Sequence, residues 1–242
     1  MTKATHSRIP WETDTSPADW IGPRLHPFGQ DTGSVVPEGF DAYCRIFHPF
    51  HSPWPDSEII TWTEVARRND RVAHASMQFH EINRPIGSPV PDRFAWDQGL
   101  RWGACPDEVI TPLLAILRTQ TSTPDRCWFC VWEGYGSIEY PRVLRKVVHP
   151  ARNYGLYGGP IENALISLDG VRSGSSPSPN LWWPDDRAWI VATEVDFAWT
   201  YVGGTDELIR EIIESDRVEA LAITLDASPM SNADAINAAL DG

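Results

Sequence analysis

Residues 127–132 read Cys-Trp-Phe-Cys-Val-Trp, an unbroken apolar run that the Gly-Tyr-Gly of residues 134–136 closes. A run of this length bounded by glycines is typical of a strand that is buried within a sheet. Residues three apart in an extended chain point to opposite faces, so Cys127 and Cys130 are not expected to share a zinc ion or a redox bond. We expect a central strand here, with two buried structural thiols.

Helical and strand patterns are interspersed on both sides of this run without a regular alternation. Thr61 and Glu64 have the spacing of a capping box, so Thr61 is expected to begin a helix. Thr205 precedes an amphipathic run and is expected to begin another. The run 106–117 predicts a third helix, which Pro112 should kink or divide. Shorter helices are expected at 161–168 and 231–240, and strands at 42–47, 71–82, 188–195, 197–202 and 218–225. This mixture favours an α+β fold, with a central, mostly antiparallel sheet and flanking helices in a single domain.

The first 60 residues are rich in Pro, Gly, His and Trp and show no sustained periodicity. Because proline interrupts both helices and sheet ladders, residues 1–60 are expected to form an irregular segment that wraps over the α+β body of residues 61–242. The Ser-, Gly- and Pro-rich stretch 170–180 is interpreted as a loop inside that body.

The chain has 242 residues and a formal net charge of −13, from 20 basic and 33 acidic side chains. This field repels phosphate backbones, so nucleic acid is not an expected ligand, whereas a basic protein partner is. Residues 180–242 hold 13 of the acidic side chains and 3 of the basic ones, which fits either a solvated acidic helix face or a docking surface.

The Lys and Arg residues near Met1 precede no apolar run, and no apolar stretch is long enough to cross a bilayer. Four cysteines in a chain of this size do not make a disulfide framework, so a cytoplasmic protein with reduced thiols is expected. No phosphate-binding glycine loop, dinucleotide fingerprint or nucleophile elbow occurs, and we expect no cofactor.

Residues 182–187 read Trp-Trp-Pro-Asp-Asp-Arg and form the candidate binding segment. Two adjacent tryptophans in an extended chain cannot both face one interior, so one is exposed or is covered by the N-terminal segment. Trp182, Trp183, Asp185 and Asp186 would then offer aromatic and acidic contacts to a basic partner. The alternative is a folded-down loop in which Asp185 has a capping or pairing role.

Two further constellations give alternative hypotheses. Glu194 and Asp196 lie two apart on an expected strand between Trp189 and Trp199, as in a carbohydrate site with paired carboxylates, or they bracket a turn. His48 and His51 have the spacing of a weak metal motif, although histidines that fill a polar gap under the proline-rich segment explain them as well. No metal site is predicted.

The stretch from Trp132 to Gly136 resembles the Trp and Gly pattern of SUKH-superfamily proteins, many of which are immunity proteins of bacterial toxin systems. Tyr135 stands where that pattern has Asn. Residues 35–49, 179–189 and 201–204 resemble a family of bacterial hypothetical proteins that are acidic and Trp-rich, which implies no activity. The sequence therefore predicts a non-enzymatic binding protein, immunity- or antitoxin-like, with Glu133 and Tyr135 as a second set of contacts. A carbohydrate-active enzyme or carbohydrate-binding module is the alternative.

Overall fold

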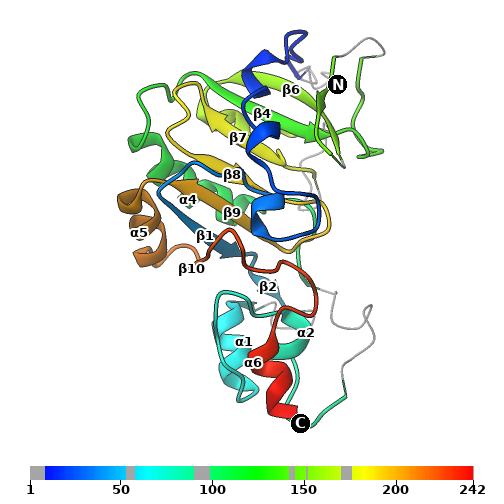
Figure 1. Cartoon of the computed structure of the whole chain (residues 1–242), viewed down its shortest axis with the longest axis vertical. Helices are drawn as coiled ribbons and strands as arrows, with labels where there is room; N and C mark the ends of the chain where they lie inside the picture. Colours follow the sequence, from blue (N-terminus) through cyan, green and yellow to red (C-terminus); the bar gives the residue numbers. More distant parts are fainter. Residues whose placement is uncertain are drawn as a thin grey trace, which may run out of the picture.

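An antiparallel sheet of eight strands organises the chain (Figure 1), in the computed structural model that describes residues 9–52, 58–89, 99–141, 145–150, 152–169 and 176–241. The strand order is β10-β1-β9-β8-β7-β4-β6-β5, and each neighbouring pair is antiparallel. The α+β class is confirmed. The strands are β1 Ala42–Phe47, β4 Cys127–Trp132, β5 Val147–Val148, β6 Asn153–Gly159, β7 Leu181–Pro184, β8 Ile190–Ala192, β9 Trp199–Gly204 and β10 Ala220–Ala222.

The apolar run at residues 127–132 is β4, an interior strand between β6 and β7, as predicted. Cys127 packs into the core on one face of the sheet and Cys130 into the core on the other. Both thiols are free and buried. Burial raises the pKa of Cys127 to about 12 and also raises that of Cys130, so neither is a ready thiolate nucleophile.

Both faces of the sheet are covered, which explains why its strands are mostly apolar on both sides. One face packs against α4 Asp107–Thr119, α5 Asp206–Glu214 and the short helix η4 Ile161–Leu165. The irregular segment 9–41 begins beside β6, where Trp11 bridges Tyr157 and packs against the helix-covered core, and then crosses the other face. It contains the 3-10 turns η1 Ser16–Ala18, η2 Gly22–Arg24 and η3 Thr32–Ser34. Residues 42–47 then enter the sheet as β1. Of the stretch 170–180, residues 170–175 lie outside the described part.

Local helix signals are confirmed at two caps. The hydroxyl of Thr61 accepts the Glu64 N–H at 3.2 Å and begins α1 Trp62–Arg68. The hydroxyl of Thr205 accepts the Leu208 N–H at 3.2 Å and begins α5. Helix α4 is not divided at Pro112. Its apolar stripe is buried along its length, and that packing offsets the missing backbone donor.

A smaller lobe lies beyond the β10 end of the sheet (Figure 1) and contains α1, α2 Phe79–Ile82, α6 Ala235–Ala238 and the two-stranded pair β2 Phe50–His51 and β3 Ile59–Ile60. The predicted strand at 71–82 is wrong, because this stretch is irregular up to α2 and is held by polar contacts with residues 234–241. Among the described residues no helix has the length and apolar character needed to span a membrane.

Glycines continue strand β9 where the sequence suggested a stop. Gly203 pairs with Tyr43 of β1, and a Cβ atom at position 203 would lie 2.8 Å from the Tyr43 ring. The aromatic ring therefore needs glycine opposite it, so residues 203 and 204 belong to the strand.

Candidate functional site

The adjacent tryptophans of the predicted binding segment are both buried, so the arrangement with one of them exposed is wrong, and the other expected arrangement, cover by the N-terminal segment, is found for Trp183. Trp182 and Trp183 lie on β7 with 0% and 1% of their surface exposed. Trp182 packs against Trp189 on the helix-covered face, with ring centroids 5.3 Å apart. Trp183 faces the other core, where Trp20 of the N-terminal segment meets it edge-on at 6.0 Å. Neither ring can contact a partner from the surface of the folded chain.

The two aspartates that follow β7 have structural partners. Asp185 accepts the indole N–H of Trp128 at 2.9 Å and lies 3.5 Å from Arg126. Asp186 accepts the backbone N–H of Ser122 at 2.7 Å and the Thr121 hydroxyl at 2.8 Å. These side-chain and backbone hydrogen bonds lower the pKa of Asp186 against the opposing effect of burial. The pair thus fixes the turn after β7 to the loop after α4.

The second set of predicted contacts is also engaged within the chain. Glu133 forms an ion pair with Lys146 and accepts the Asn153 amide at 2.7 Å. The Tyr135 hydroxyl accepts the Asn180 amide at 3.1 Å and donates to a backbone carbonyl. Burial raises the pKa of Tyr135 to about 12. Glu133 thus ties the turn after β4 to the β5–β6 region, and Tyr135 ties it to the start of β7.

The carboxylates of the alternative carbohydrate site lie in the turn between β8 and β9, which is the bracketing arrangement rather than a strand pair. One guanidinium, that of Arg152, donates to Glu194 at 2.7 Å and to Asp196 at 2.8 Å. The flanking rings of Trp189 and Trp199 are 0% and 3% exposed and belong to the core, so they cannot stack on a sugar. A shared guanidinium and buried rings do not favour glycoside chemistry.

His48 and His51 point to different partners. The His48 ring is fully buried, 2.7 Å from the Arg101 carbonyl and 2.9 Å from the Thr200 hydroxyl, so it fills a polar gap as the alternative interpretation expected. Burial lowers its pKa to about 4. The exposed His51 pairs with Glu108 at 2.5 Å. Across the described ranges, no three His, Cys, Asp or Glu side chains gather as a metal site requires.

Helix α5 carries an exposed acidic surface. Its outer side presents four exposed carboxylates and one exposed arginine, Arg210. Within the described part of the chain three of the four carboxylates have neither an ion pair nor a side-chain hydrogen bond, and Glu211 accepts only the Gln120 amide at 2.8 Å. We call this set the α5 acidic face: Asp206, Glu207, Glu211 and Glu214. The charge excess after residue 180 is consistent with this acidic helix face, but it did not indicate which helix carries it.

A groove of about 400 Å³ lies beyond the end of α5, where β1, β3, α1 and α4 converge. Apolar groups form its floor, and three carboxylates and one arginine line its walls. We call it the acidic groove: Phe47, Pro49, Ile59, Thr61, Thr63, Glu108, Val109, Asp216, Arg217, Val218 and Glu219. Glu108 also lines a larger, more polar cavity of about 660 Å³ beside the start of α4. No motif marks the groove, because its residues come from four separate stretches of sequence.

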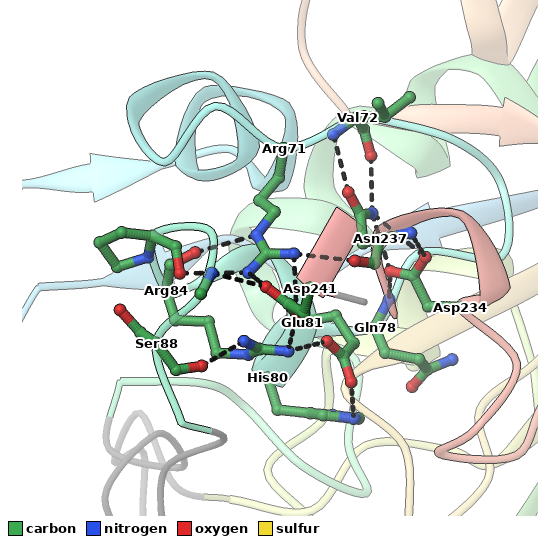
Figure 2. A network of polar contacts seen from close by, with 12 residues as sticks. Arg71, Val72, Gln78, His80, Glu81, Arg84, Ser88, Asp234, Asn237 and Asp241 are labelled. Carbon is green, nitrogen blue, oxygen red and sulfur yellow. Dashed lines mark hydrogen bonds and ion pairs between the residues drawn. The ribbon is translucent and has the colours of Figure 1, made fainter. Parts of the chain in front are cut away.

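Within the lobe, a buried polar network, shown in Figure 2, joins segment 234–241 to residues 71–88. The Arg71 side chain is fully buried and donates to the carbonyls of Arg84, Pro85 and Asn237 at 2.8 to 3.1 Å. It also pairs with Asp241 at 2.8 Å, and Arg84 contacts the same carboxylate. The Arg71 guanidinium lowers the pKa of Asp241.

The same network continues through the start of α6. The Asn237 amide exchanges hydrogen bonds with the backbone of Val72, at 2.8 and 2.9 Å. Asp234 accepts from His74 at 2.7 Å and from the Gln78 N–H at 3.0 Å. These contacts hold the lobe together, while Gln78 Nε2 and Arg84 Nε are buried without a hydrogen-bond partner among the described residues.

No family model, curated protein or solved structure matches the chain. The candidate site therefore rests on the geometry of the α5 acidic face and the acidic groove. The resemblance to SUKH-superfamily proteins stays a prediction.

Proposed function

We propose that this chain is a non-enzymatic binding protein that engages a basic protein partner through the α5 acidic face. The observation that carries the proposal is the contrast between two groups of carboxylates. Asp185, Asp186, Glu133, Glu194 and Asp196 have partners inside the chain, whereas among the described residues only Glu211 of the exposed α5 carboxylates has a side-chain partner, the Gln120 amide.

An unpaired acidic face on a chain of net charge −13 attracts cationic proteins over distances of about a Debye length, ~10 Å at 0.1 M salt. Helix α5 has nine residues and is about 13 Å long, so its four carboxylates form a concentrated stripe of charge. Such a stripe raises association rates and selects partners by charge. The immunity-type role that the SUKH resemblance implies is one case of this proposal.

Binding is preferred to catalysis because the nucleophile and acid candidates are occupied or buried. Cys44 and Cys105 are buried thiols, and burial raises the pKa of each to about 12. Arg152 bridges Glu194 and Asp196.

Affinity capture from cells of the source organism tests the proposal, with the wild-type chain and the double variant Glu207→Lys, Glu214→Lys as baits. Proteins of basic isoelectric point should be captured by the wild type and lost with the variant. The matched control is Asp19→Lys, Glu139→Lys, which changes the net charge equally at exposed carboxylates elsewhere. Equal capture by all three baits would contradict the proposal.

A further inference from the structure

The acidic groove combines an apolar floor with a lining that holds three carboxylates and one arginine. Ile59 also lines the groove and has 60% of its surface exposed, so an apolar group of the groove is open to solvent. The groups of Val109, Val218 and Phe47 that line the groove belong to residues otherwise buried in the core. The floor is therefore rigid, and Ile59 is the apolar group that a ligand would cover.

The charges around this floor favour a cation. Asp216 is exposed and has no ion pair among the described residues, and Arg217 is the only basic side chain in the groove lining. Glu108 pairs with His51 at 2.5 Å. Glu219 accepts the N–H groups of Trp62 and Thr63 at 2.6 Å each. Three carboxylates thus oppose one arginine.

An anionic ligand is disfavoured at the same place. The positive amino-terminal end of α1 is already compensated by the two hydrogen bonds to Glu219. The corresponding end of α4 carries Asp107 and Glu108 in its first turn. Neither helix end has uncompensated positive potential with which to bind a phosphate or a carboxylate.

We propose that the acidic groove receives a Lys or Arg side chain, together with a neighbouring apolar residue, from an extended segment of the basic partner. Lysine and arginine have long apolar stems with a charged head, so the stem can lie on Ile59 while the head reaches Asp216. The 400 Å³ of the groove accommodates one such side chain and part of its neighbour. This inference rests on the proposed function, and it assigns the anchoring contact to the groove and the long-range attraction to the α5 acidic face.

A phage-displayed library of random 12-residue peptides, selected on the wild-type protein at low salt, provides the test. The inference predicts enrichment of Lys or Arg next to an aliphatic or aromatic residue. Each of the single substitutions Ile59→Ser and Asp216→Lys should lower the affinity of the selected peptides by at least about fivefold, as measured by fluorescence anisotropy.

The opposite edge of the sheet supplies matched controls. Val148 is 74% exposed on the two-residue strand β5, as Ile59 is exposed on the two-residue strand β3, and Asp19 is an exposed carboxylate beside it. Val148→Ser and Asp19→Lys should leave peptide affinity unchanged. Equal effects of the groove and control substitutions would overturn the inference.

The outcomes separate the groove from the proposed function. One outcome is that basic peptides are enriched and that salt and the double substitution Glu207→Lys, Glu214→Lys weaken their binding. If those peptides bind the groove variants as tightly as the wild type, the groove inference is wrong and the proposed function stands. A selection without enrichment of Lys or Arg overturns both.

Discussion

Replacing Arg71 by Met should strongly destabilise the protein. The Arg71 side chain is fully buried and makes five hydrogen bonds, three to backbone carbonyls and two to Asp241. Methionine fills similar space but donates none of them. Each acceptor left buried and unpaired costs about 1–3 kcal/mol, and water reaches some of them. We therefore expect a loss of about 3–5 kcal/mol in the free energy of unfolding, the range for breaking a buried ion pair.

Urea unfolding and thermal unfolding followed by circular dichroism measure this loss. For a chain of this length the expected change lowers the thermal midpoint by roughly 6–20 °C. Arg67→Met is the control, because Arg67 lies on the outside of α1 and forms a surface pair with Glu64 at 2.6 Å. Its midpoint should match the wild type, since exposed ion pairs contribute little.

Hydrogen exchange distinguishes local opening of the lobe from global unfolding. In the Arg71→Met variant the amides of residues 72–88 and 234–241 should lose protection before those of β4. A midpoint for Arg71→Met equal to that of Arg67→Met would refute the reasoning, because the network would then not hold the lobe.

Three other perturbations test the core. Ala in place of either Trp182 or Trp183 should lower the free energy of unfolding by about 3–5 kcal/mol in urea titrations, because each ring is fully buried. Burial lowers the pKa of His48 and His149 from 6.5 to about 4, so below pH 6.5 the unfolded chain binds protons that the folded chain does not. Stability should therefore fall as the pH decreases from 6.5 to 4, and His149→Gln should flatten that part of the curve of urea midpoint against pH. Burial also raises the pKa of all four thiols, so a disulfide reagent should label them only after unfolding: Cys44, Cys105, Cys127 and Cys130.

Features that depend on neighbouring residues were predictable from the sequence. The caps at Thr61 and Thr205 are hydrogen bonds between residues three apart, and a short-range spacing specifies them. The central strand 127–132 is uniformly apolar because both of its faces are covered. The α+β class follows from such local patterns, since they set the number and kind of the elements.

Features that depend on distant residues were not predictable. For the Trp-Trp-Pro-Asp-Asp stretch the sequence left exposure and cover by the N-terminal segment open, and only the structure shows that Trp20 covers Trp183 on β7. The stretch 71–82 has strand-like composition, but hydrogen bonds to Asp234 and Asn237 fix it in an irregular path. A single sequence does not specify which distant segment buries a given side chain or forms hydrogen bonds with a given stretch.

The candidate site was predictable in its charge but not in its position. The acidic excess after residue 180 is visible in the sequence, and most of those carboxylates could equally have been the contacts. Contacts seen only in the structure separate engaged acids such as Asp185 and Asp186 from Asp206, Glu207 and Glu214 of α5, which have no side-chain partner among the described residues. The acidic groove joins residues as distant as Phe47 and Glu219, so no spacing indicates it.

The central claim is that the α5 acidic face binds a basic partner, and a titration of the captured partner at several salt concentrations tests it most directly. Calorimetry should give a dissociation constant for the wild type that rises steeply with salt. For Glu207→Lys, Glu214→Lys we expect affinity lower by about tenfold at low salt, with a flatter salt dependence. The same affinity and the same salt dependence for both proteins would contradict the claim.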